Sequence, residues 1–315
     1  MDGIAASSER PEPSIARYLY RAHGVTLAVD RPAPRLSPLP SPGRDEPISL
    51  AFGAVPLALD RPEVQDEYFQ ATARSYLFRQ PKQWAVLVED GREALFEGGP
   101  ALSEEQFWYS AVTNAAGVAG YQRGMFPLHG SGVLFPAGMV AFTGRSGAGK
   151  TTLTAGLVQR DYPLFADDLC LIRPERGTYL TGRGAPEIRL LRDAAEALGW
   201  DHDDSFGHQP ARDKFAFVRE QSPIDDAPML AIVELDFADG PPRLERLEGV
   251  APFTALVAGI RLRMGLPSFP RAQRGPAFAL VTRMARDIPV YRFTRPRRYE
   301  AFAAGLDLLV GAFGR

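Results

Sequence analysis

Apolar and polar residues alternate along this chain in two patterns, one with the period of a strand and one with the period of a helix. The strand-like runs predict strands at residues 18–29, 48–52, 84–89, 128–134, 139–143, 164–166, 169–172, 230–235 and 290–293. The helix-like runs predict helices at residues 65–77, 104–121, 150–160, 277–286 and 299–313. No stretch repeats, so we expect no repeat architecture.

Two local signals organise the first third of the chain. Six prolines fall between residues 31 and 47, and this composition predicts an extended connector. Ser103 followed by Gln106 has capping-box spacing, so we expect the helix of residues 104–121 to begin there. We predict a small α+β domain over residues 1–124, whose role the sequence does not indicate, and a catalytic domain over residues 125–315.

A glycine-rich loop follows the predicted strand 139–143. From Gly144 to Thr151 it fits the pattern G-x-x-x-x-G-K-[ST] at every fixed position. The glycines let successive backbone N–H groups point into one concavity, and the following helix adds its positive end. Lys150 would reach the outer phosphates, and the Thr151 hydroxyl would ligate Mg²⁺. The pattern is that of the Walker A loop, which binds the phosphates of a nucleoside triphosphate. We expect the triphosphate to be bound by Gly144, Arg145, Ser146, Gly147, Ala148, Gly149, Lys150, Thr151 and Thr152.

Three further residues are candidates for chemistry beside this loop. Asp167 and Asp168 follow the short apolar run 164–166. One carboxylate could bind Mg²⁺ while the other accepts a proton from an attacking hydroxyl. The alternative is an ordinary surface turn, because aspartate is common in turns. His129 stands at the start of the strand 128–134, where a structural role competes with a catalytic one.

Composition narrows the choice of partners. The chain has 315 residues, a formal net charge of −2 and 45% hydrophobic residues, enough for one large domain or two moderate ones. A net charge so close to zero gives no electrostatic reason to expect nucleic acid or a membrane surface as a partner. Cys170 is the only cysteine, so no internal disulfide can form, which suits the cytoplasm. No signal peptide is visible, and the longest apolar run is too short to span a membrane.

The motifs together resemble a known family. The segments 128–131, 142–151, 157–160 and 165–168 look like the catalytic domain of HPr kinase/phosphorylase. They look still more like the HPr-kinase-related proteins of bacterial peptide-modification loci. The resemblance covers residues 128 to about 190, and the first third does not resemble the regulatory domain of HPr kinase.

This resemblance implies an α/β fold with a P-loop kinase core of the phosphoenolpyruvate-carboxykinase type. It implies ATP and Mg²⁺ as cofactors, a serine of a protein or peptide as acceptor, and a homo-oligomer. Asp167 would be the general base, Asp168 would lie near the metal, and His129 would lie near the transferred phosphate. Glu187 matches a glutamate that helps to hold the metal. Its alternative role is an ordinary acid at a helix start.

The chain departs from the bifunctional enzymes directly after residues 187–189. Leu190, Leu191 and Arg192 stand where those enzymes carry a glycine-containing signature, which argues against a reverse phosphorylase activity.

Other functions fit the same loop. A kinase of a small molecule, such as a free amino acid or a sugar, would use the same core. An ATP-hydrolysing switch would need a catalytic glutamate after an apolar strand, and Glu234 is the nearest candidate. An inactive nucleotide-binding regulator is a third reading. Lys214, Arg286 and the basic cluster 295–298 could hold phosphate or an acidic substrate, although solvated surface is the expectation. We expect Cys170 to pack in the core.

Overall fold

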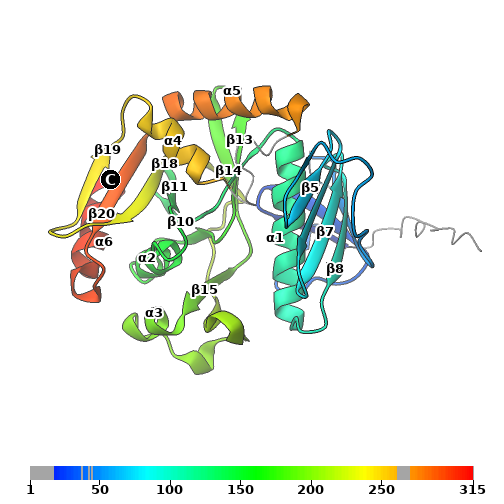
Figure 1. The fold of residues 1–315 in the computed structure, drawn as a ribbon. Coiled ribbons are helices and arrows are strands. Elements are labelled where there is room, and N and C mark those ends of the chain that lie inside the picture. Colours follow the sequence, from blue (N-terminus) through cyan, green and yellow to red (C-terminus); the bar gives the residue numbers. More distant parts are fainter. Residues whose placement is uncertain (1–17, 37, 42, 44, 261–269, 315) are drawn as a thin grey trace, which may run out of the picture.

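The computed structural model describes residues 18–36, 38–41, 43, 45–260 and 270–314. The start of the predicted first domain and parts of the proline-rich connector lie outside these residues. The described chain is a mixed α/β protein whose strands form sheets of eight, nine and three strands (Figure 1).

The N-terminal sheet has the strand order β1-β2-β3-β8-β7-β6-β5-β4. Strand β3 pairs in parallel with β2 and β8, and the other pairs are antiparallel. The strands are β1 Tyr18–Ala22, β2 Val25–Val29, β3 Ile48–Phe52, β4 Val64–Gln65, β5 Phe69–Ala71, β6 Ser75–Gln80, β7 Trp84–Glu89 and β8 Glu93–Gly98.

The prediction of one strand over residues 18–29 was wrong, because the segment is a hairpin of β1 and β2. His23 and Gly24 form its turn with φ of 52° and 79°. Gly24 also lies so close to Gly182 that a side chain at residue 182 would collide with the Gly24 backbone. The turn therefore needs its glycine both for its backbone conformation and for this contact.

The predicted helix at residues 65–77 was also wrong, because the segment forms β4, β5 and the start of β6. Two side chains close turns that a helix would not contain. Asp66 Oδ1 accepts hydrogen bonds from the backbone N–H groups of Tyr68 (2.6 Å) and Phe69 (2.9 Å). Thr72 Oγ1 accepts one from the Ser75 N–H at 2.9 Å. Such local bonds give the backbone an alternative to helical pairing.

Helix α1, Glu104–Gln122, confirms the helix predicted from the capping spacing. The Ser103 side chain caps it by accepting from the Gln106 N–H at 3.2 Å. One face of α1 covers the N-terminal sheet, where Trp108 and Val112 join the core cluster of the sheet. Its other side faces the rest of the molecule, with Gly120 against Leu171 (Figure 1). Helix α1 is therefore shared between the N-terminal sheet and the remainder of the chain.

The central sheet runs β12-β10-β11-β18-β14-β13-β9, and β20 extends it from β18 and carries β19. Strand β18 is parallel to both β11 and β20. The prediction of one strand over residues 128–134 misses a break at His129, which separates β9 from β10. The strands are β9 Phe126–Leu128, β10 Gly130–Phe135, β11 Gly138–Thr143, β12 Leu164–Ala166, β13 Cys170–Glu175, β14 Thr178–Gly182, β18 Asp226–Phe237, β19 Arg243–Arg246 and β20 Val290–Arg295.

Helices cover both faces of the central sheet. One core joins it to α2, Lys150–Val158, and α6, Phe302–Phe313. A second core joins it to α4, Ala251–Ala258, and α5, Arg271–Asp287. Cys170 is fully buried in this second core, as predicted. The short helix η4, Tyr299–Ala301, precedes α6.

The third sheet lies beside α2. In Figure 1, its strand β15 and the helix α3 lie below α2. Its order is β15-β17-β16, from Glu187–Leu191, Lys214–Val218 and Gly207–Gln209. Helix α3, Arg192–Ala197, follows β15, and the short helices η1, His202–Asp204, and η2, Pro210–Arg212, flank β16. Glu187 therefore begins a strand, not a helix.

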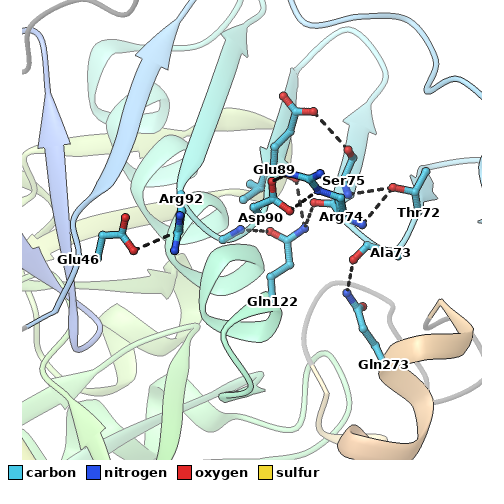
Figure 2. Close-up of polar contacts among 12 residues, drawn as sticks. Glu46, Thr72, Ala73, Arg74, Ser75, Glu89, Asp90, Arg92, Gln122 and Gln273 are labelled. Atoms are coloured by element: carbon cyan, nitrogen blue, oxygen red, sulfur yellow. Dashed lines mark hydrogen bonds and ion pairs between the residues drawn. The ribbon is translucent and has the colours of Figure 1, made fainter.

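Polar contacts tie the N-terminal sheet to helices α1 and α5 (Figure 2). At the end of α1, the Gln122 carboxamide donates to the Arg74 carbonyl at 2.9 Å and accepts from the Gly91 N–H at 2.7 Å. Gln273 of α5 donates to the Ala73 carbonyl at 3.0 Å. The turn before β6 thus contacts two helices that are far apart in sequence. No helix in the described part of the chain is long and apolar enough to cross a membrane.

Candidate active site

The glycine-rich loop connects the end of β11 to the start of α2. Gly144, Gly147 and Gly149 have φ of 141°, 80° and 81°, a region that other residues rarely adopt. A side chain at Gly144 would also lie 2.8 Å from the Leu235 carbonyl oxygen. The pattern predicted from the sequence therefore has a geometric basis at each of its glycines.

Lys150 is the first residue of α2 and is largely buried. Its Nζ donates to the carbonyl oxygens of Gly144 (2.9 Å) and Arg145 (3.3 Å), so the side chain folds back over the loop. Burial lowers the pKa of Lys150, and the charges of Asp168 and Asp167 oppose that shift. The ammonium thus lies over the loop with two carboxylates nearby.

Asp167 follows β12 and points toward the start of α2. Its Oδ1 accepts from the Thr151 hydroxyl at 3.0 Å, and its Oδ2 accepts from the Arg189 N–H at 3.2 Å. Burial raises the pKa of this carboxyl, and the charge of Asp168 raises it further. The charge of Lys214 and the two hydrogen bonds act in the opposite direction. A cation beside Asp167 and Thr151 would relieve the unfavourable charge.

Asp168 points to different partners, because its φ of 67° turns the chain between the two aspartates. The Tyr109 hydroxyl donates to Asp168 Oδ2 at 2.9 Å. His129 Nδ1 lies 3.2 Å from both Asp168 Oδ1 and the Asp168 carbonyl oxygen. Since both of these oxygens are acceptors, Nδ1 must carry the proton. Asp168 is thus held by α1 on one side and by the break between β9 and β10 on the other.

A buried ionic group adjoins the aspartates. The Arg189 guanidinium bonds to Glu105 of α1 and to Glu187 Oε1, the latter at 3.0 Å, and lies 3.6 Å from the ring centroid of Tyr109. All three charged side chains are at least nine-tenths buried. Burial raises the pKa of Glu187, while the charge and hydrogen bond of Arg189 oppose the shift. Glu105 and Tyr109 were not predicted as site residues, although they are four positions apart on one helix face.

Two adjoining cavities meet at the aspartates. The loop cavity, of about 420 Å³, is lined by Ser146, Gly147, Gly149, Lys150, Thr151, Thr152, His129, Leu190 and Leu191. The second cavity, of about 250 Å³, lies against α1 and the β6–β7 turn. We call it the amide cavity, because its lining includes the carboxamides of Gln80, Gln83, Gln106, Asn114 and Gln209. The residues that line both cavities are Thr151, Asp167, Asp168, Arg189, Arg212 and Lys214.

The structure thus brings most of the predicted site residues to one place. Gly144, Arg145 and Ala148 belong to the loop but do not line its cavity. Glu187 does not line it either, and Arg189 occupies its carboxylate. The basic residue Lys214 does line the cavity, although a solvated position was expected for it. Within the described residues, neither Lys214 nor Arg212 forms an ion pair or a side-chain hydrogen bond.

Other candidates lie elsewhere. Glu234 accepts from the Nε and Nη2 of Arg292 at 3.0 and 2.8 Å and is absent from the lining of both cavities. Arg286 pairs with Asp287 at 2.7 Å. Arg295 is buried, which corrects the expectation of a solvated basic cluster at this position.

Few oxygen and nitrogen ligands are grouped for a metal ion in the part of the chain that the structure describes. The described residues contain no cluster of three or more His, Cys, Asp or Glu side chains suited to a metal. Mg²⁺ at a nucleotide site needs only one or two protein oxygens, because phosphates and waters complete its shell. The Thr151 hydroxyl and the Asp167 carboxylate, 3.0 Å apart, meet that smaller requirement.

Comparison with known proteins gives a structural likeness but no match in sequence. No family model matches the chain, and no curated protein matches it. A solved structure of the HPr(Ser) kinase/phosphatase from Coxiella burnetii is similar, with 11% sequence identity and a TM-score of 0.31. The match covers 59% of this chain and 95% of that chain.

Proposed function

We propose that this chain is a kinase with a P-loop core, which uses ATP and Mg²⁺ to phosphorylate a hydroxyl group, with a serine of a peptide or protein as its acceptor. The observation that carries the proposal is the hydrogen bond between Thr151 and Asp167 beside a second carboxylate, Asp168, on the same cavity as the glycine-rich loop. A nucleotide-binding protein without transfer chemistry would not need the second carboxylate.

The loop cavity binds the phosphates of ATP in this proposal. Backbone N–H groups of Gly147 and Gly149 and the start of α2 supply hydrogen bonds and a positive end. On binding, Lys150 exchanges its loop carbonyls for phosphate oxygens. Arg212 of η2 and Lys214 of β17 line the same cavity and stabilise charge on the transferred phosphoryl group.

Thr151 and Asp167 are the proposed protein ligands of Mg²⁺. Their oxygens are already adjacent, and burial raises the pKa of Asp167, so a cation beside it would favour its charged form. Thr151 and Asp167 would hold the ion, which would supply positive charge against the negative charge that develops during transfer. This assignment exchanges the two aspartate roles that the family resemblance implies, because Asp167, not Asp168, accepts the hydrogen bond of the Thr151 hydroxyl.

Asp168 is the proposed general base. The acceptor hydroxyl enters from the amide cavity and gives its proton to the Asp168 carboxylate. Its oxygen bonds to the γ-phosphorus as the bond from that phosphorus to the β–γ bridging oxygen breaks, and ADP leaves. His129 and Tyr109 hold Asp168 in place through their hydrogen bonds. The transition state is loose, so positioning and charge neutralisation provide most of the catalysis.

The two aspartates can be told apart experimentally. Asp168→Asn should lower phosphate transfer by about 10²–10⁴-fold, the usual contribution of a general base, and leave ATP·Mg²⁺ affinity unchanged. Asp167→Asn should weaken ATP binding in Mg²⁺ but not in EDTA. Calorimetry with a non-hydrolysable ATP analogue and transfer of labelled γ-phosphate to a lysate of the source cell measure both effects. The reverse pattern would restore the roles implied by the resemblance.

Two controls address the proposal as a whole. Lys150→Ala should abolish nucleotide binding, and retained tight binding would contradict a phosphate-binding loop. Glu234→Gln should leave all rates unchanged, since Arg292 already occupies that carboxylate. Loss of ATP hydrolysis in Glu234→Gln would favour the ATP-driven switch instead.

A further inference from the structure

The amide cavity has a second group of polar lining residues besides the aspartates. Five carboxamide side chains lie there, drawn from the end of β6 and its turn, from α1 and from β16. They are Gln80, Gln83, Gln106, Asn114 and Gln209. The cavity is continuous in its residues with the loop cavity, since both include Thr151 and the two aspartates. A group bound among the carboxamides would therefore lie beside Asp168.

Most of the hydrogen-bonding capacity of these carboxamides is unused. Within the described residues, the side chains of Gln80, Gln83 and Gln209 make no hydrogen bond. Asn114 is 3% exposed and uses one amide proton, which it donates to the Ser110 carbonyl at 2.8 Å. Gln106 donates to the His208 carbonyl at 3.3 Å. Because these donors and acceptors remain available at the cavity wall, the lining is suited to a polar ligand.

The chemistry of the lining limits what that ligand can be. A carboxamide offers both a donor and an acceptor, which matches the N–H and C=O groups of a peptide backbone. The charged residues of the cavity all lie in the part shared with the loop cavity. The part of the cavity among the carboxamides thus offers no opposite charge to an ammonium or a carboxylate. An acidic or basic segment would be equally unpaired there.

We propose that the amide cavity is the acceptor site and that it binds an extended, uncharged peptide segment carrying the serine to be phosphorylated. The inference rests on the proposed kinase function, which supplies the reaction at Asp168. The exposed Gln83, in the β6–β7 turn, marks an opening to solvent through which a chain can enter. The N-terminal sheet and α1 thereby acquire a role in recognising the acceptor.

Removal of two unused carboxamides tests the site. The probes are labelled ATP with Mg²⁺ and a peptide library with a fixed central serine and varied flanking residues, beside free L-serine and D-glucose. The double substitution Gln83→Ala and Gln209→Ala should raise KM for the preferred peptide about tenfold, the effect of losing two ordinary hydrogen bonds. Its ATP affinity should not change. Gln65→Ala, an exposed glutamine on β4, is the matched control and should behave as wild type.

A charge introduced at residue 83 should change which peptides are preferred, and loss of structure would not produce such a change. The wild-type enzyme should select uncharged residues beside the serine. Gln83→Lys should shift that selection toward aspartate and glutamate at the flanking position nearest residue 83, because the new ammonium pairs with them.

The outcomes separate this inference from the function on which it rests. A wild-type chain that fails to bind ATP contradicts the kinase itself. A chain that binds ATP but labels L-serine or D-glucose in preference to every peptide, or labels none of the probes, overturns the peptide assignment alone. Peptide labelling with unchanged KM and selectivity in the residue 83 and 209 variants overturns the location of the acceptor site.

Discussion

At the scale of single residues, Arg295, the last residue of β20, stabilises the glycine-rich loop through a direct contact. Its Nη2 donates to the Ala148 carbonyl at 3.1 Å, and its guanidinium lies 4.7 Å from the ring centroid of Phe237. Burial lowers the pKa of Arg295. The same guanidinium occupies the space that a side chain at Gly149 would need. Arg295 therefore helps to fix the loop without lining the cavity.

Arg295→Gln should weaken ATP binding about tenfold, because the loop loses a hydrogen bond from a charged donor. Arg297→Gln is the control, since Arg297 lies over the same Phe237 ring but is exposed. Calorimetric titration with an ATP analogue measures both variants. Equal affinities in the two would show that the Ala148 contact does not support binding.

The residues of the site differ in how far the sequence could reveal them. The loop is recognisable because its geometry depends on consecutive residues, and Asp167 and Asp168 could be placed beside it for the same reason. The partners of Asp168 could not be found in this way. Tyr109 lies 59 positions from Asp168, and Glu105 lies 84 positions from Arg189, so only the tertiary fold brings them together.

At the scale of elements, the ionic group of Glu105, Glu187 and Arg189 joins α1 to β15. Both carboxylates and the guanidinium are buried, so each depends on the others for compensation. The helix α1 was predictable from its cap and its apolar period. The strands β4 to β6 could not be predicted, because their apolar spacing resembles that of a helix. The side chains of Asp66 and Thr72 accept backbone hydrogen bonds that form turns there instead.

Arg189→Met should destabilise the protein by about 3–5 kcal/mol, because two buried carboxylates lose their counter-charge. Arg192→Met serves as the control, since its pair with Asp213 is exposed at 2.8 Å, and a much smaller change is expected. Urea unfolding followed by circular dichroism gives both free energies of unfolding. Similar losses in the two variants would mean that burial of the Arg189 group is unimportant.

Alanine substitution should have opposite effects on stability at two glycines that lie in helices. Gly120→Ala should destabilise the protein by about 1–3 kcal/mol, because its new methyl group would overlap the Leu171 side chain. Gly311→Ala in α6 meets nothing within 4 Å and should instead stabilise by about 0.5–1 kcal/mol through helix propensity. Thermal unfolding of the two variants should shift in opposite directions, and a shift of the same sign would contradict the packing of α1 on β13.

At the scale of the whole molecule, Asp226 connects the N-terminal sheet to the central sheet. Its carboxylate bonds to Arg21 of β1 at 2.8 Å and to Arg173 of β13 at 2.9 Å. Burial acts to raise the pKa of Asp226, but the Arg173 hydrogen bond and the Arg21 charge outweigh it, so the pKa lies below its ordinary value. The boundary predicted near residue 124 is therefore crossed by ion pairs as well as by the contacts of α1 with β13.

This linkage gives a pH dependence with a definite sign. A carboxyl with a lowered folded-state pKa contributes stability above its unfolded pKa, about 3.9, and loses it as pH falls through the folded value. Asp226→Asn should thus be less stable than wild type at pH 7, and the difference should shrink below about pH 4. Urea unfolding at pH 7 and pH 3 measures it. A difference that is constant with pH would assign the effect to packing.

The amide cavity has walls from two separate parts of the sequence, and this separation has a consequence for how such a protein can change. The loop, the aspartates and the basic residues come from residues after 125, whereas most of the carboxamides come from residues before it. In the proposed assignment, substitutions in the β6–β7 turn or at Gln106 would therefore alter what is recognised and leave the phosphate chemistry intact. A lineage of such proteins could diversify its targets by drift in the first third alone. A chimaera that exchanges that third would be a direct route to a new specificity.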